Sequence, residues 1–464
     1  MERTAPRQVP ASTSAPRPRR APAACSSAPS PAPPSRATSA PYLPRRPEAS
    51  PLYRVLADHF ETLERVHEER FEPTHGPLSA AARRAAGRLL DCARLDHGFA
   101  RVRCGECRAE FLVAFRCHGR YFCPSCQARR LAEWSLWLAE QLLARVPYRQ
   151  VVLTLPKRLR AYLMYDRRRL GRLSRVAYRT LCRYLRAALG EPEVVPGVIV
   201  CVQTFGSLAH AHPHWHLLVT DGGFRRDGAF VAAPAHDAAV LEEAWRRAVL
   251  GWFVAQEWLE EDAAQAMLGW PHSGFGAHVG PRLAADAREG VLRVARYAAR
   301  GPVAESRLRY DAERAEVERV SDARDGPYVG VHRMSALEFL ARWVDHVPAR
   351  YEMRIRYYGA FATKRRVWWR RRGVVLMAAP EAQPGAAEPA ADWPELRARR
   401  RRWAELLRLV YAVDVEVCVR CGGAARIVGF VTEAHAIRRI LDHLKQRGIE
   451  ARAGPWTGAA AAPG

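Results

Sequence analysis

Two pairs of cysteines, each pair separated by two residues, are the feature of this sequence that most constrains its fold. They lie within residues 101–130, "RVRCGECRAEFLVAFRCHGRYFCPSCQARR". Four thiolates on two such pairs provide the tetrahedral ligand set of a structural zinc ion and leave no position open for water. Such an ion holds a small folded unit together. The sequence therefore predicts one structural Zn²⁺ site with the ligands Cys104, Cys107, Cys123 and Cys126.

Other cysteines and one histidine are alternative ligands for such a site. Cys117 and His118 lie between the two pairs, and either can replace one of the four ligands. A third pair, Cys418 and Cys421, lies near the C-terminus. Because two ligands do not complete a tetrahedral site, this pair is either half of a second zinc site or a remnant of one.

A zinc deaminase is a second interpretation of the N-terminal cysteines. The deaminase signature has His-x-Glu before Pro-Cys-x-x-Cys, and "HEE" at residues 67–69 precedes the cysteine pairs here. In this chain, however, Pro124 follows Cys123 instead of preceding it. The additional cysteine pair also favours a closed structural site over a catalytic one.

The chain is strongly basic. Lys and Arg number 73 against 48 Asp and Glu, which gives a formal net charge of +25. This charge predicts an anionic partner, with nucleic acid as the leading class, although a high arginine content can also serve solubility alone. No apolar run approaches the ~20 residues that span a bilayer, and the first residues lack a secretory signal. We therefore expect a cytoplasmic, nucleoid-associated protein with no membrane partner.

Histidines alternate along a stretch that has the pattern of a strand, "HAHPHWHLLVTDGG" at residues 210–223. In a strand, successive side chains point to opposite faces, so His212, His214 and His216 share one face and Trp215 lies on the other. Two imidazoles on one face can bind one cation and leave coordination positions for a phosphate oxygen and water. The third ligand is either Gln203, on the preceding strand, or His212. The simpler alternative is a half-exposed histidine pair without a metal.

A basic segment with two tryptophans follows near residue 364, "KRRVWWRRR". Basic residues beside aromatic rings suit phosphate contact and base stacking. A solvated loop with one buried tryptophan is the alternative. The residues predicted to contact nucleic acid here are Lys364, Arg365, Arg366, Trp368 and Trp369.

The histidine stretch, "VQTFGSLAHAHPHWHLLVTDGGF", resembles the part of insertion-sequence-91 family transposases that carries a His-hydrophobic-His motif. Further blocks follow in the family's order: "HSGFGAH", "ARYAARGPVAESRL" and "RIRYYGAFA", between the cysteine block and the late "CVRCGGAARIVGFV". The resemblance covers roughly residues 85–445. An ordered succession of blocks is far more specific than one motif.

The resemblance implies an HUH-type single-strand DNA transposase. Such an enzyme nicks and rejoins single-stranded DNA at transposon ends in a rolling-circle-like reaction, through a tyrosine linked to a 5′ phosphate. The histidine pair would hold a catalytic Mg²⁺ or Mn²⁺ ion. The nucleophile falls on Tyr297, and Arg293, Arg296 and Arg300 lie near it in the sequence as candidate DNA contacts. Some family members have a second tyrosine four residues away, but here position 301 is glycine, which implies a single-tyrosine mechanism.

These observations together predict an α+β protein with a central antiparallel sheet flanked by helices, as in HUH nucleases. An N-terminal zinc-binding unit and a small C-terminal unit complete it. The alternative function is a non-enzymatic zinc-containing nucleic-acid-binding or regulatory protein, which would have no use for an open metal site beside a tyrosine. The sequence leaves the oligomeric state open. The expected parts are a disordered basic tail at 1–50, a zinc-binding domain at 51–145, the transposase domain at 146–362, a basic segment and linker at 363–400 and the C-terminal unit with its Cys-x-x-Cys pair at 401–464.

Overall fold

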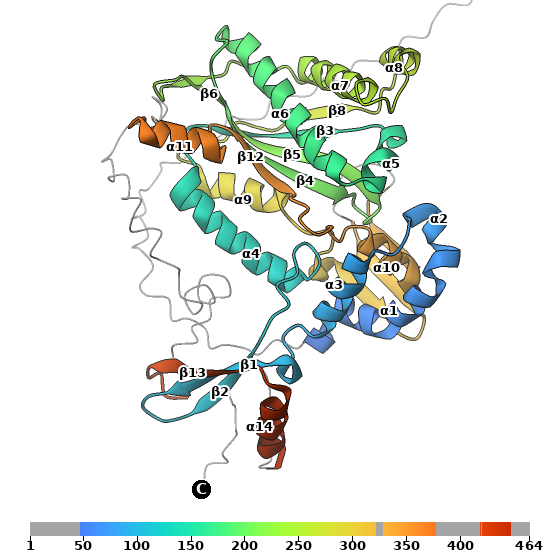
Figure 1. Cartoon of the computed structure of the whole chain (residues 1–464), viewed down its shortest axis with the longest axis vertical. Helices are drawn as coiled ribbons and strands as arrows, with labels where there is room; N and C mark the ends of the chain where they lie inside the picture. The colour runs from blue at the N-terminus through green and yellow to red at the C-terminus, as the bar shows by residue number, and fades with distance from the viewer. Residues whose placement is uncertain (1–46, 322–327, 377–417, 419, 447–464) are drawn as a thin grey trace, which may run out of the picture. The chain divides into compact units, whose positions relative to one another are not determined.

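The computed structural model describes residues 47–321, 328–376, 418 and 420–446 (Figure 1). The expected basic tail, apart from its last residues, and most of the expected linker lie outside the described residues. Among the described helices, none combines the length and the apolarity needed to cross a bilayer.

A five-stranded antiparallel sheet forms the centre of the fold, in the order β12-β4-β5-β3-β8. Its strands are β3 (Tyr148–Thr154), β4 (Gly197–Phe205), β5 (Ala211–Thr220), β8 (Gly276–Val279) and β12 (Ile355–Gly359). All nine residues of β4 are buried, because the strand is apolar and both of its faces are covered. The predicted α+β class with a central antiparallel sheet is confirmed.

One face of this sheet packs against helices that include α6 and α7. Trp215 and Leu217 of β5 share a core with Leu173 of α6 and Trp245 of α7. The arginine-rich helix α6 places leucines on its buried side, while arginines such as Arg175 lie on its exposed side. The helices of this layer are α5 (Lys157–Tyr165), α6 (Arg168–Leu189), α7 (Ala238–Val254) and α8 (Glu261–Leu268). The short hairpin β6 (Gly222–Phe224) and β7 (Phe230–Ala232) follows β5.

The other face carries the histidine pair and packs against a second set of helices (Figure 1). Ile199, Cys201 and Leu218 of the sheet share a core with Val291 and Ala295 of α9. The helices of this layer are α4 (Pro124–Trp137), the π-helical turn η3 (Leu138–Leu142), α9 (Arg288–Ala298) and α11 (Thr363–Arg371). The alternation of β5 therefore directs its histidines toward α9 and its tryptophan toward α6.

The N-terminal helices pack against a segment that follows α9 in the chain. Leucines of α1 share a core with Phe339 and Trp343 of α10, and Phe122 stacks on Trp343 with ring centroids 3.6 Å apart. The N-terminal elements are η1 (Pro47–Ala49), α1 (Pro51–Arg70), α2 (Glu72–His75) and α3 (Ala80–Leu90). The later elements are η4 (Glu305–Arg307), β9 (Leu308–Asp311), β10 (Glu316–Val320), β11 (Val331–Ser335) and α10 (Ala336–Val344).

A separate three-stranded sheet joins the two ends of the described chain, in the order β13-β1-β2. It consists of β1 (Phe99–Cys104), β2 (Glu110–Ala114) and β13 (Ala425–Val431), and it is preceded by η2 (Leu95–His97) and followed by α14 (Ala434–Gln446). Ile437 of α14 packs with Leu95, Phe99 and Leu112 in the core of this sheet. We expected residues 401–464 to form a small C-terminal unit. Their strand β13 instead pairs with β1, in the β1–β2 hairpin that carries Cys104 and Cys107, which we call the N-terminal cysteine hairpin.

Candidate active site and metal centres

The two histidines of the His-Trp-His stretch converge on one point above the sheet. Nε2 of His214 lies 3.0 Å from Nε2 of His216. Two ligand atoms at right angles around a cation, each about 2.1 Å from it, are about 3.0 Å apart. The pair therefore fits two adjacent positions around one divalent cation.

The other ring nitrogen of each histidine has a partner that orients the ring. Nδ1 of His214 lies 2.7 Å from the carbonyl oxygen of His212, which can only accept, so Nδ1 carries the proton and Nε2 keeps its lone pair. Nδ1 of His216 lies 2.9 Å from the side-chain amide of Gln150, on β3. The atom placed there is the amide nitrogen; metal binding through Nε2 of His216 requires this amide to be turned so that its oxygen accepts from Nδ1–H.

Burial keeps His216 neutral, which is the form that binds a metal. Desolvation lowers the pKa of His216 well below its usual value, and the nearby His214 and Arg300 lower it further. The pKa of His212 is lowered to about 3, mainly by burial and then by Arg160. Neutral imidazoles need not lose a proton before they coordinate a cation.

Gln203 lies opposite His214 in the β4–β5 register and is buried. Its amide nitrogen donates hydrogen bonds to the carbonyl oxygens of Tyr297 (3.0 Å) and Ala298 (2.9 Å), at the C-terminal end of α9. The Tyr297 carbonyl also accepts a long bond of 3.4 Å from the backbone N–H of Arg300, and the bonds from Gln203 anchor this end of α9 to the sheet. Only its amide oxygen remains for a metal, and His212 beside His214 stays the other candidate for the third ligand.

Tyr297 lies against the histidine pair. The centroids of the Tyr297 and His216 rings are 5.8 Å apart with the rings nearly perpendicular, and 47% of the Tyr297 side chain is exposed. The guanidinium of Arg300 lies 4.5 Å from the centre of the Tyr297 ring. The structure thus brings together a phenol, a cationic group and two imidazoles from β5 and α9, in a place open to solvent.

Three other tyrosines, Tyr310, Tyr357 and Tyr358, have partners elsewhere. The hydroxyl of Tyr310 bonds to Asp58 and His59, both at 2.8 Å. Tyr357 accepts a hydrogen bond from Trp134, and Tyr358 stacks on Tyr178. Burial raises the pKa of Tyr357 to about 12.

The predicted nucleic-acid contacts on α9 and just after it differ in how accessible they are. Arg293 is exposed, and Arg300 lies over the Tyr297 ring. Arg296 instead forms an ion pair with Glu289 at 2.5 Å, so part of its charge is already neutralised. Arg293 is therefore the most accessible of the three.

The basic segment with two tryptophans is the helix α11, and its tryptophans have different surroundings. Trp369 is only 3% exposed, and its indole nitrogen donates to the carbonyl oxygen of Arg226. The prediction that Trp369 stacks on bases is therefore wrong, because the helical period turns this ring into the core. Trp368 is half-buried among guanidinium groups, and Arg372 lies 4.3 Å from the centre of its ring. Lys364 is exposed, whereas burial lowers the pKa of Arg366.

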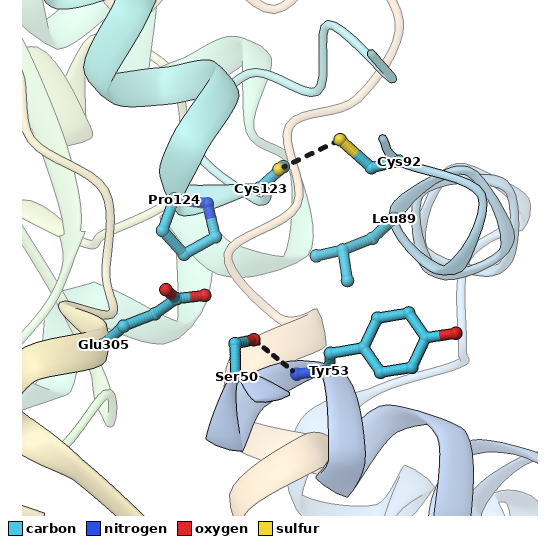
Figure 2. Close-up of a pocket in the computed structure, with 7 residues that line it drawn as sticks. All are labelled: Ser50, Tyr53, Leu89, Cys92, Cys123, Pro124 and Glu305. Carbon is cyan, nitrogen blue, oxygen red and sulfur yellow. Dashed lines mark hydrogen bonds between the residues drawn. The ribbon is translucent and has the colours of Figure 1, made fainter. Parts of the chain in front are cut away.

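Four cysteines gather where α4 begins, and we call them the first cysteine cluster. Their Sγ atoms lie within 4.8 Å of one another. The closest pairs are 3.6–3.8 Å apart, and sulfur atoms at the corners of a tetrahedron around zinc are about 3.8 Å apart. Figure 2 shows Cys92 and Cys123 pointing toward each other at the edge of a small pocket that also includes Ser50 and Leu89. The members of the cluster are Cys92, Cys117, Cys123 and Cys126.

The close approach of these thiols perturbs their titration. Hydrogen bonding with Cys123 and the other two thiols raises the pKa of Cys117, whereas the same contacts lower the pKa of Cys123. Four neighbouring thiols can all lose their protons only if a cation offsets the charge. The donor set therefore fits zinc.

The predicted grouping of Cys104 and Cys107 with Cys123 and Cys126 is wrong. The structure divides the two pairs between two clusters, and the second contains Cys104, Cys107, Cys418 and Cys421. Closeness in sequence does not place the pairs together, because Cys104 ends β1 whereas Cys123 precedes α4. Cys117, which we considered as a substitute ligand, belongs to the first cluster. Cys92 also belongs to it, but no Cys-x-x-Cys spacing in the sequence indicated its role.

Two family models match this chain. One, described as a transposase zinc-binding domain, matches residues 63–155, and the other, described as "Putative transposase", matches residues 197–367. The first match contains the whole first cysteine cluster, and the second contains the histidine pair and Tyr297.

Two further proteins are similar over most of their length. The transposase for insertion sequence element IS801 of Pseudomonas savastanoi pv. phaseolicola is 26% identical over 357 residues, which cover 74% of this chain and 81% of the relative. The "Putative transposase y4qJ" of Sinorhizobium fredii is 28% identical over 329 residues, which cover 65% of this chain and 80% of the relative. No solved structure shows a significant match.

Proposed function

Because this chain belongs to the insertion-sequence-91 family of transposases, we propose that it nicks and rejoins single-stranded DNA at transposon ends through a bond between Tyr297 and a 5′ phosphate. The observation that carries this proposal is the contact of an exposed tyrosine with a converging histidine pair. Such a pair beside a nucleophile is the arrangement that metal-assisted phosphoryl transfer requires.

The chain's own residues perform the following steps. The phenol oxygen of Tyr297 attacks the phosphorus, the bond from phosphorus to the 3′ oxygen breaks, and the proton lost by the phenol is balanced by the proton that the 3′ oxygen gains through solvent. Arg300, whose guanidinium lies 4.5 Å from the centre of the Tyr297 ring, attracts the phosphate by its charge. In the reverse reaction a 3′ hydroxyl attacks the phosphotyrosine and releases Tyr297, so strands are rejoined without an external energy source.

His214, His216 and either Gln203 or His212 would hold a Mg²⁺ or Mn²⁺ ion. When bound, this ion supplies charge neutralisation of the scissile phosphate and stabilisation of the leaving oxygen. Gln203 also acts through α9: its hydrogen bonds to the Tyr297 and Ala298 carbonyls fix the end of the helix that carries the nucleophile.

Zinc in the first cysteine cluster would have a structural role. Its four thiolates leave no position for substrate. Cys123 caps α4, which packs against α9 through the core on the catalytic face. The ion thereby supports the helix layer that positions Tyr297.

A labelled single-stranded oligonucleotide carrying an element end tests this function. Wild-type protein with Mg²⁺ or Mn²⁺ is expected to retain, on a denaturing gel, only the label that lies 3′ of the cut. Tyr297→Phe keeps the ring and removes the attacking oxygen, so it should bind the oligonucleotide equally and form no adduct. Tyr162→Phe, also an exposed tyrosine, is the matched control and should behave as wild type. Binding without cleavage or adduct in wild type would favour the non-enzymatic DNA-binding alternative.

A further inference from the structure

The second cysteine cluster joins residues from opposite ends of the chain. Sγ of Cys104 lies 3.6 Å from that of Cys421, 317 residues later, and Sγ of Cys107 lies 3.6 Å from that of Cys418, 311 residues later. All four sulfur atoms lie within 4.8 Å of one another. Cys418 and Cys421 lie beyond both family matches, the later of which ends at residue 367.

The strand pairing explains why these residues meet. β1 ends at Cys104, β13 begins at Ala425, and the two residues are partners in an antiparallel ladder. In such a ladder the end of one strand lies beside the beginning of the other. The cysteine loop that follows β1 and the cysteine loop that precedes β13 therefore emerge at the same end of the sheet.

The two loops also share two backbone features. The residue after the second cysteine is left-handed in both, with φ of 58° at Arg108 and 74° at Gly422. The first cysteine of each loop donates its backbone N–H to the carbonyl five residues later, from Cys104 to Ala109 and from Cys418 to Gly423, both at 2.8 Å. The cysteines of the two loops thus bring their sulfur atoms together at one point.

Contacts between the loops hold this arrangement. Gly105 donates its backbone N–H to the carbonyl oxygen of Ala424 at 2.9 Å. A side chain at position 423 would meet the carboxylate of Glu106, so the two loops are in contact at this point. The loops are therefore packed against each other as well as aligned.

We propose that Cys104, Cys107, Cys418 and Cys421 bind a second zinc ion, which fastens the segment beginning at residue 418 to the N-terminal cysteine hairpin. The 3.6 Å separations are close to the edge of about 3.8 Å expected for four sulfur atoms around zinc. Thiolates select zinc over the harder cations that suit the histidine pair. The zinc-binding part of this protein is thus built from two segments that flank the catalytic region, and a chain cut before residue 418 loses half of one site.

The second ion and α14 secure the same sheet from different sides. The zinc would close the loops at one end of the β1–β13 pair, while Ile437 of α14 fills the core against Phe99 and Leu112. The ladder between the strands runs from Cys104 with Ala425 to Phe99 with Val431. Loss of the metal would therefore loosen the cysteine end first.

Metal analysis of the purified full chain tests the proposal. We expect two zinc ions per chain in wild type and one in the Cys418→Ala/Cys421→Ala variant. The Cys182→Ala/Cys201→Ala variant, which removes two buried cysteines outside both clusters, is the control and should retain two. A Cys418→Ala/Cys421→Ala variant that keeps as much zinc as wild type would overturn the proposal.

Alkylation of the unmutated protein provides a test that does not depend on variant folding. Cys421 is exposed in the structure, so a metal-free thiol there would react at once with iodoacetamide. We expect Cys421 to stay unmodified, by mass spectrometry, until a strong chelator strips the zinc. Immediate modification of Cys421 while the protein retains all its zinc would contradict the second site.

Discussion

The first cysteine cluster and the histidine pair are both sets of metal-binding side chains, but their surroundings differ. The cluster has four sulfur ligands, three of them buried, and its geometry is complete. The pair offers two imidazole nitrogens, with an exposed tyrosine and an arginine beside them. A complete soft-ligand set suits an ion that only holds the chain, whereas an incomplete set leaves coordination positions for a phosphate. We therefore propose a structural role for the first cysteine cluster and a catalytic role for the histidine pair.

Removal of one histidine should give the largest loss of activity. His216→Ala deletes a proposed ligand of the catalytic ion, so we expect cleavage of a single-stranded element end to fall by roughly 10³-fold or more. Single-strand binding should remain near wild type in a gel shift, because arginines and lysines provide most of the phosphate attraction. His435→Ala, an exposed histidine on α14, is the control. Equal loss of binding and cleavage in His216→Ala would contradict a catalytic role of the histidine pair that is separate from DNA binding.

Removal of one cysteine should act on stability. Cys123→Ala breaks the first cluster, and we expect the loss of one zinc and a decrease in the free energy of unfolding of at least about 3 kcal/mol. Cys182→Ala, in the core of α6, should retain all zinc and cost only about 1 kcal/mol. Chemical denaturation and metal analysis of both variants measure this. Similar stability in the two variants would show that the first cluster holds no structural ion.

Replacement of Gln150 should have a smaller effect, which is confined to the affinity for the metal. Gln150→Ala removes the partner of His216 Nδ1, so we expect the Mg²⁺ concentration for half-maximal cleavage to rise roughly 10–100-fold. The maximal rate at saturating Mg²⁺ should recover. Gln150→Glu, whose carboxylate accepts from Nδ1–H, should restore most of the affinity. A lowered maximal rate with unchanged Mg²⁺ dependence would assign Gln150 a different role.

Trp368 should have the smallest effect. Trp368→Ala removes the accessible ring of α11, so single-strand affinity should fall by about fivefold, as expected for a stacking contribution of about 1 kcal/mol. Trp270→Ala, which removes an exposed tryptophan after α8, should leave affinity unchanged. Fluorescence anisotropy at fixed salt compares them. Equal affinities of both variants and wild type would exclude Trp368 from the DNA-binding surface.

Local periodicity was enough to predict the strand that carries the histidines. Alternation along β5 placed His214 and His216 on one face and Trp215 on the other, as the structure has them. The helical repeat of α6 likewise separates its leucines from its arginines. Both patterns depend only on neighbours in the sequence, so tertiary packing does not alter them.

Partnerships between distant residues could not be predicted in the same way. The spacing within each Cys-x-x-Cys pair shows that a pair binds metal but does not show which pairs share an ion. The placement of Cys104 beside Cys421 depends on the β1–β13 ladder, which joins strands more than 300 residues apart. Trp369 is buried and Arg296 is paired with Glu289 because of the helix faces on which they lie. The contact of Gln150 with His216 crosses from β3 to β5, and no local motif marks it.

Identification of the DNA-linked residue tests the central claim most directly. Wild-type protein is incubated with the single-stranded element end and Mg²⁺, digested with nuclease and trypsin, and analysed by mass spectrometry. The account predicts one nucleotide-bearing peptide, residues 297–300, with the added mass on Tyr297. Tyr297→Phe should yield no nucleotide-bearing peptide. An adduct on any other residue, or one that persists in Tyr297→Phe, would contradict the assignment of Tyr297 as the nucleophile.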